Sequence, residues 1–235
     1  LLGKNIKGVS VIILISLMND LFGLSFGFSL NIHFVIVIIF IPKLIHDFKL
    51  IPKKSKSLLK PLYIEFVYLA LLALVFGYLI PWESYYDYQR SWSQRAEGRA
   101  LIQIFKLILE FGLILILLLW LSKKQLTIEF LLKAVSSIIS FTVIFAVIDV
   151  SLGGVLKQFL FQDARIIPGR FTGLNGEPRV LGRICSYTLL LLIAFRTTYK
   201  SKIMGVGIVF SIIGLVISLS ASAFVMTLIW GTLFI

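Results

Sequence analysis

The chain has 235 residues, of which 59% are hydrophobic and 14% are charged, and its mean hydropathy is +1.00. Apolar runs close to the length of a bilayer-spanning helix recur along it. This excludes an ordinary soluble domain and predicts a multi-pass membrane protein. The formal net charge of +12 becomes informative only when the cations are assigned to the two sides of the membrane.

Apolar runs predict the membrane-spanning helices. Residues 8–45 are too many for one helix across a hydrocarbon core of about 30 Å, so we expect the chain to reverse near Gly27 to Asn31. The predicted fold is an all-α, polytopic transmembrane helix bundle that forms a single domain over residues 1–235, with seven spans and a truncated eighth. The predicted helices cover residues 8–23, 31–45, 62–80, 101–121, 126–149, 181–195 and 203–220, and the truncated one begins near 222.

The two ends of the chain predict a fragment, because it begins without methionine and stops inside an apolar run. Lys4 and Lys7 precede the first run, but no small-residue cleavage site follows it, so we expect this span to be retained as a helix. The single cysteine, Cys185, can form no internal disulfide.

The kinds of cation differ between the two predicted sides of the membrane. Placing the N-terminus in the cytoplasm gives that side most of the cations, as the positive-inside rule requires. The inner loops carry lysines together with Arg196, whereas the outer loops carry arginines together with Lys157. Because a guanidinium binds anions better than a hydrated ammonium does, we interpret the lysines as topology signals and the outer arginines as functional.

The alternative for any one outer arginine is a salt bridge within the loops. The acids available for such pairing are Glu83, Asp87, Glu97, Asp163 and Glu177. They are fewer than the outer arginines, so pairing of every arginine is the weaker interpretation.

Residues 151–180 form the predicted outer loop after the fifth span. The loop opens with Gly153-Gly154, and residues 155–161 have the amphipathic pattern of a short helix at the membrane interface. Connections of this length are usually functional or disordered, and we expect function here.

Arginine, glycine and proline are concentrated between Arg165 and Arg183. Glycine-rich turns bring backbone N–H groups together, and such turns bind anions beside guanidinium groups. We therefore expect a pocket for phosphate or pyrophosphate. The alternative for the glycines is that they only turn the chain back toward the membrane. The predicted pocket residues from this stretch are Arg165, Arg170, Gly173, Arg179 and Arg183.

Two further segments are expected on the outer face. Ser218, Ser220 and Ser222 could bind oxygens of a glycan or a phosphate, although serines in membrane helices more often bond to their own backbone or a neighbouring helix. The loop over residues 81–100 combines arginines with tryptophan and tyrosine. These rings could stack on sugars, but an aromatic belt at the interface is the commoner explanation.

Charged residues inside the spans leave a transporter open as an alternative. Lys106 with Glu110 and Glu129 with Lys133 are spaced to neutralise each other on one helix face. Three further acids have no oppositely charged residue at the i,i+4 spacing in the sequence and could line an ion path, namely Asp20, Glu65 and Asp149. The sequence carries no metal-ligand spacing, Walker loop or dinucleotide fingerprint, so we expect no metal, no cofactor and no nucleic-acid partner.

The stretch RFTGLNGEP over residues 170–178, followed by an apolar helix and the later SLSAS turn over residues 218–222, resembles the membrane polymerases and ligases of bacterial O-antigen. The resemblance implies a helix bundle in the bacterial plasma membrane, part of the cell envelope. Its members transfer glycans from undecaprenyl pyrophosphate to an acceptor on the outer face.

On this resemblance, Arg170 and Arg179 would bind the donor pyrophosphate, assisted by Arg165 and Arg183, and stabilise the charge of the leaving group. Glu177 would hold an arginine in position or act as a general base. The first role is favoured, because a carboxylate among guanidiniums is a poor base.

The resemblance therefore implies a polysaccharide polymerase, a membrane glycosyltransferase with no cofactor. The SLSAS turn lacks an arginine, which favours a polymerase over the O-antigen ligase that transfers the glycan to lipid A core. The third alternative is a flippase of the same lipid-linked oligosaccharide. The expected partners are the undecaprenyl-pyrophosphate-linked glycan, membrane lipids and a chain-length regulator.

Overall fold

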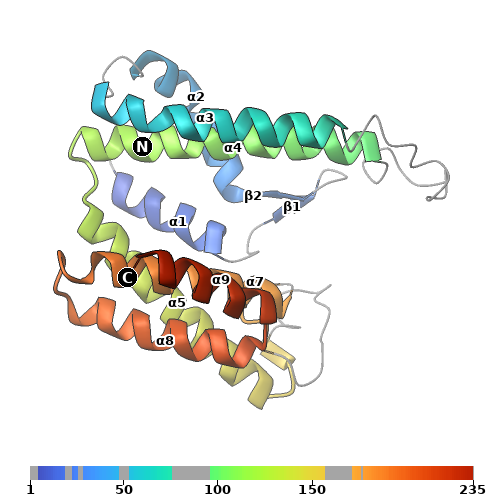
Figure 1. Ribbon diagram of the computed structural model, residues 1–235, viewed down its shortest axis with the longest axis vertical. Coiled ribbons are helices and arrows are strands. Elements are labelled where there is room, and N and C mark those ends of the chain that lie inside the picture. The colour runs from blue at the N-terminus through green and yellow to red at the C-terminus, as the bar shows by residue number, and fades with distance from the viewer. Residues whose placement is uncertain are drawn as a thin grey trace. The chain divides into compact units, whose positions relative to one another are not determined.

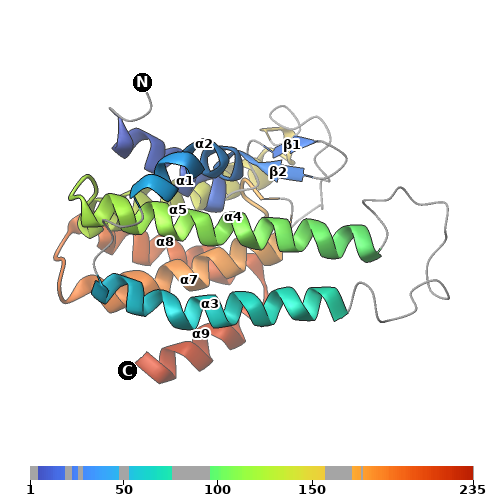
Figure 2. The same cartoon turned by 90° about the horizontal axis from the view of Figure 1, so that it is seen from above.

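The computed structural model describes residues 5–18, 23–25, 29–47, 53–75, 96–156, 171–175 and 177–234 (Figures 1 and 2). The chain divides into two compact units. The first unit comprises Leu1–Leu21 with Thr127–Ile235, and the second comprises Phe22–Leu126. The prediction of a single domain stays a prediction.

The first unit is a bundle of helices: α1 (Ile6–Met18), α5 (Ile128–Ser151), α7 (Pro178–Arg196), α8 (Lys202–Ser218) and α9 (Ala221–Phe234). Helix α7 packs against both α8 and α9, and α8 also packs against α5. Helix α1 contacts α5. The core between these helices consists mainly of branched aliphatic side chains, such as the fully buried Ile139, Val143 and Leu181.

Helix α5 has defined signals at both of its ends. At the start, the Thr127 Oγ1 accepts a hydrogen bond from the Phe130 N–H at 3.2 Å, which satisfies an amide that has no partner within the helix. At the end, Gly153 and Gly154 both have positive φ, and the Gly154 N–H donates to the Asp149 carbonyl at 2.7 Å. The Gly153-Gly154 pair therefore ends the helix, because glycine adopts this conformation without strain.

Small residues allow α8 to approach its neighbours closely. A Cβ added at Gly207 would lie 2.6 Å from the Ser136 Cβ on α5, and one added at Gly214 would lie 2.7 Å from a methyl group of Val143. Within a membrane the hydrophobic effect does not drive helices together, so such close packing contributes much of the helix association.

The second unit contains α2 (Ile32–Asp47), α3 (Lys53–Leu74) and α4 (Ala96–Ser122), with the strands β1 (Gly23–Ser25) and β2 (Ser29–Asn31). Helix α4 packs against both α2 and α3. The rings of Phe40 and Trp120 meet edge to face at 5.4 Å between centroids. Over the described residues the fold is helical apart from the short hairpin of β1 and β2.

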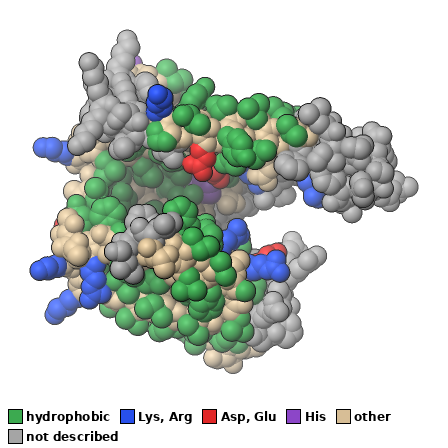
Figure 3. Space-filling model, in the orientation of Figure 1, with side chains coloured by type: hydrophobic (Ala, Val, Ile, Leu, Met, Phe, Trp, Pro, Cys, Tyr) green, Lys and Arg blue, Asp and Glu red, His purple; other side chains and the backbone are tan. Residues whose placement is uncertain are grey.

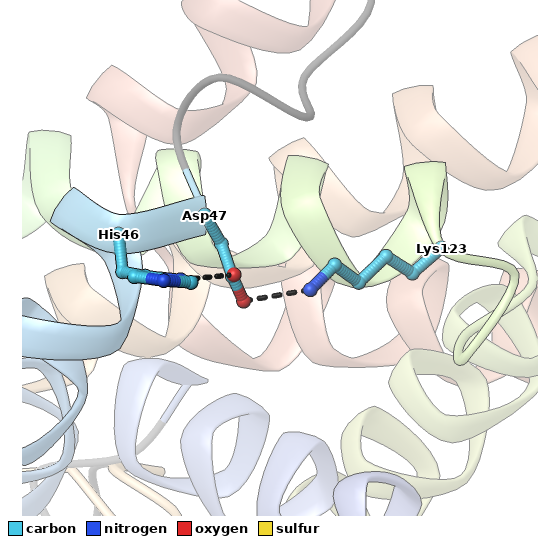
Figure 4. A network of polar contacts seen from close by, with 3 residues as sticks. All are labelled: His46, Asp47 and Lys123. Atoms are coloured by element: carbon cyan, nitrogen blue, oxygen red, sulfur yellow. Dashed lines mark hydrogen bonds and ion pairs between the residues drawn. The ribbon is translucent and has the colours of Figure 1, made fainter.

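A polar contact joins the ends of α2 and α4 (Figure 4). The Lys123 Nζ donates to Asp47 Oδ2 at 2.6 Å, and the His46 ring contacts Asp47 Oδ1 at 3.0 Å. The hydrogen bond from Lys123, followed by that from His46, holds the pKa of the Asp47 carboxyl below its usual value.

The helices follow the apolar runs of the sequence. Strand β1 pairs antiparallel with β2, with Leu24 opposite Leu30, so the predicted chain reversal before α2 is confirmed. Three helices among the described residues are long and apolar enough to cross a membrane, over Gly98–Ser122, Ile128–Ser151 and Pro178–Arg196. They indicate a membrane protein, whereas the predicted count of seven spans is not confirmed.

Several helix ends differ from the prediction. Helix α3 begins at Lys53 and passes through Pro61, and α4 begins at Ala96. The lysines from 53 to 60 and Arg99 therefore lie on helices and not in loops. The prediction was wrong at these ends because it was based on hydropathy, which marks the apolar part of a helix and misses polar turns that continue it.

Candidate anion pocket

A pocket of about 440 Å³ lies in the first unit, where the start of α7 meets the connection between α8 and α9. One exposed guanidinium and three serines provide its polar groups. The lining residues are Pro178, Arg179, Ser218, Leu219, Ser220, Ala221 and Ser222. The structure thus brings together Arg179 and the three serines, four of the residues that the sequence marked as a candidate site.

The start of α7 is fixed by a proline. Glu177 has the extended conformation of a helix cap, with φ of −136°, and Pro178 occupies the first helical position. Proline is favoured there because its missing N–H has no partner in the helix and its φ is already helical. Arg179 follows at once, is exposed and lines the pocket.

The connection between α8 and α9 is very short. Leu219 has φ of 48° and ψ of 34° and ends α8 in the left-handed region, which costs a residue other than glycine about 1–2 kcal/mol. Its side chain is 82% exposed. The Ser220 carbonyl accepts the first hydrogen bonds of α9, from the Ala223 and Phe224 N–H groups. Residues in unusual backbone conformations often cluster at binding and active sites.

The serines differ in their freedom to bind a ligand. Ser218 is buried and donates to the Leu215 carbonyl at 2.8 Å, so the expected alternative of bonding to its own backbone is confirmed for this residue. The Ser220 and Ser222 hydroxyls lie 3.2 Å apart in hydrogen-bond contact. Ser222 is exposed, so this pair is the better candidate for contact with a ligand.

Gly182, which no motif in the sequence marked, allows α7 to pack closely against Ser218, Ser220 and Ala223 beside the pocket. A Cβ at this position would lie 2.6 Å from the Ser218 Oγ, 2.8 Å from the Ser220 Cβ and 3.1 Å from the Ala223 Cβ. One turn further on, the Ser186 and Thr227 hydroxyls lie 2.7 Å apart, which joins α7 to α9. A small residue four positions before a serine on an apolar helix was the only signal for this packing in the sequence.

Arg183 lies one turn beyond Arg179 on the same face of α7, and both are exposed. Within the described part of the chain, no ion pair joins Glu177 to either arginine. The predicted positioning role of Glu177 therefore stays a prediction. The predicted pair of Glu129 with Lys133 is confirmed, with a distance of 2.6 Å between Oε1 and Nζ.

Gly173 is not among the residues that line this pocket. It has φ of +60°, and a Cβ there would lie 3.0 Å from the Thr142 Cγ2 on α5. Its turn contains a hydrogen bond of 3.2 Å from the Asn175 N–H to the Thr172 carbonyl. The structure therefore supports the interpretation of Gly173 as a turn residue packed on α5, while a contact with a ligand stays untested.

Several predicted features lie outside the described residues. Arg165 and Arg170 are among them, as are Asp20, most of the predicted interfacial helix and the aromatic loop from 81 to 95. Their predicted roles stay predictions.

No protein-family model matches the chain, and neither a curated protein nor a solved structure matches it. The resemblance to O-antigen polymerases and ligases therefore rests on the short stretches at 170–178 and 218–222.

Proposed function

We propose that the chain is a membrane glycosyltransferase that extends a polysaccharide on the outer face of the bacterial plasma membrane, with undecaprenyl pyrophosphate as the carrier of the donor glycan. The observation that carries the proposal is the pocket in which Arg179 adjoins Ser218, Ser220 and Ser222 at the end of a helix bundle. A diphosphate ester needs charged and neutral hydrogen-bond donors together, and this pocket offers both kinds.

The chemistry assigned to this pocket is electrostatic. An acceptor hydroxyl attacks the anomeric carbon of the donor sugar, and the bond from that carbon to the diphosphate oxygen breaks. The diphosphate leaves with the electron pair and therefore gains negative charge. Arg179 stabilises that charge as a charged hydrogen-bond donor directed at the leaving group. The proton of the hydroxyl passes to a base, the secondary role considered for Glu177.

The volume of the pocket agrees with a ligand of this kind. Sites for small ligands usually enclose about 300–1,000 Å³, and this pocket has about 440 Å³. That space accommodates a diphosphate with an adjoining sugar, and the rest of a growing glycan would extend away from the protein. The exposed Leu219 at the rim offers an apolar contact to the first isoprene units of a carrier lipid.

The experiment that tests this function is replacement of Arg179 by alanine in cells that make the polysaccharide. We expect long chains to fall by about 100- to 1,000-fold, the usual effect of removing one electrostatic donor. Transfer of a single repeat to its acceptor should persist at normal protein level. Lys43→Ala is the control, because Lys43 is an exposed cation outside the pocket.

Other outcomes identify the alternatives. Loss of single-repeat transfer together with the long chains would indicate a flippase, since no donor would reach the outer face. Accumulation of long chains on the carrier lipid, without their transfer to lipid A core, would indicate a ligase. Unchanged long chains in Arg179→Ala would refute all three functions for this pocket.

A further inference from the structure

The opposite end of α7 carries a second cationic surface, on the turn that joins α7 to α8. Arg196 is the last residue of α7, and Lys202 is the first of α8. Lys200 lies between them, and all three side chains are exposed. These three cations, which we name the basic turn, lie on one short connection that the proposed function does not use.

The turn that presents these cations is ordered. The Tyr199 and Thr198 N–H groups both donate to the Phe195 carbonyl, at 2.9 and 3.2 Å. The rings of Phe195 and Tyr199 pack together, with 6.2 Å between their centroids. Both side chains also pack against the buried cluster that contains Leu192 and Met204. The backbone that carries the cations is therefore held at one place on the bundle. Binding of a ligand then requires little further ordering of this turn, which lowers the entropic cost of binding.

The described part of the chain gives the basic turn no counter-charge. None of its cations forms an ion pair there. The first turn of α8 contains no acidic residue, so Lys202 lies beside the positive end of the helix dipole, where a cation is unfavourable. Glu129, in the first turn of α5, is already paired with Lys133 at 2.6 Å. An external anion would relieve this repulsion.

An apolar band adjoins the basic turn. Ile193 on α7 and both Ile203 and Val206 on α8 are exposed within one or two turns of the cations. Figure 3 shows hydrophobic side chains over α8, with Lys and Arg toward the helix ends. A ligand that matches both parts carries negative charge at one end and acyl chains at the other.

We infer that the basic turn is a binding site for an anionic glycerophospholipid, with the phosphate among Arg196, Lys200 and Lys202 and the acyl chains along Ile203 and Val206. This site lies at the other end of α7 from the anion pocket, and its test does not depend on the proposed function. Each basic residue near an anionic membrane surface strengthens binding to that surface by about fivefold, so three together strengthen it on the order of 100-fold.

The experiment is native mass spectrometry of the full chain in neutral detergent, with phosphatidylglycerol and phosphatidylcholine in equal amounts. The wild type should retain phosphatidylglycerol in preference. The variant R196Q/K200Q/K202Q should bind it on the order of 100-fold more weakly. The matched control K43Q/K60Q/K124Q removes the same charge from exposed lysines elsewhere and should bind as the wild type does.

Further measurements keep the inference testable if the triple variant folds poorly. Binding to the unmodified protein should fall steeply in 1 M salt, where the screening length is about 3 Å. Glycerol phosphate without acyl chains should not compete. Salt-independent retention, equal losses in the triple variant and its control, or competition by glycerol phosphate would each overturn the inference.

Discussion

Gly182 on α7 and Ser218 at the end of α8 are packed so closely that a Cβ on the glycine would lie 2.6 Å from the serine Oγ. The hydroxyl could rotate away from such a group. The Cβ atoms of Ser220 and Ala223, at 2.8 and 3.1 Å, are fixed to the backbone and could not. The shape of the anion pocket therefore depends on the absence of a side chain at Gly182.

We predict that Gly182→Ala displaces α9 from α7 and destabilises the protein by about 1–3 kcal/mol, the usual cost of overpacking. Thermal unfolding in detergent measures the change. Gly205→Ala on α8 is the matched control, because nothing lies within 4 Å of a Cβ added there. It should stabilise by about 0.5–1 kcal/mol, since alanine is the better helix former. Equal unfolding temperatures for the two variants would contradict this packing.

The hydrogen bond between Ser186 and Thr227 should contribute about 0.6 kcal/mol, the average for such bonds between membrane helices. Thr227 donates to the Ala223 carbonyl, so Ser186 is the donor in the contact between the hydroxyls. Thr227→Val removes that contact with little change of shape. Thr232 is the control, because its hydroxyl bonds to the Ile229 carbonyl of its own helix. In reversible unfolding, Thr227→Val should have a lower free energy of unfolding than Thr232→Val. Adding Ser186→Ala to Thr227→Val should lower the free energy of unfolding little further.

The contact of Asp47 with Lys123 predicts acid-sensitive stability. The pKa of Asp47 in the folded protein is lowered, so the contact stabilises the fold above the unfolded-state value of about 3.9 and loses its effect as the pH falls through the folded-state value. Asp47→Asn should therefore lower the unfolding temperature at neutral pH by an amount that shrinks in acid. Lys123→Gln should behave alike. A difference that is constant over the whole pH range would contradict the assignment.

Labelling of single cysteines should place the two ends of α7 on opposite sides of the membrane. The only native cysteine, Cys185, is fully buried and should not react. Glu177→Cys and Thr198→Cys lie at exposed positions beyond the two ends of the helix. We expect an impermeant maleimide to label the first in intact cells and the second only after permeabilisation. The reverse pattern would place the anion pocket in the cytoplasm and refute the proposed function.

The sequence predicted those features that depend on local chemistry. Apolar runs located the helices, Gly153-Gly154 marked the end of α5, and the reversal before α2 followed from the length of a bilayer-spanning helix. The combination of Arg179 with Ser218 and Ser222 was predicted from the expectation that both segments reach the same face. Each of these inferences uses residues close together in the chain or the geometry of a membrane.

Features that depend on packing between distant segments could not be predicted in this way. Gly182 indicates close packing only once α7 is known to lie against the connection between α8 and α9. The bond from Lys123 to Asp47 joins residues separated by most of the second unit, and neither side chain has a local pattern that identifies the other. Tertiary packing selects these partners, and a single sequence does not record it.

The connection between α8 and α9 at Leu219 and Ser220 is so short that its number of residues is also constrained. Because α9 starts directly after it, an inserted residue would rotate α9 by about 100° about its axis. This rotation would break both the contact of Ala223 with Gly182 and the hydrogen bond of Thr227 with Ser186. Unlike most surface connections, this one should tolerate substitutions far better than the insertion or deletion of a residue.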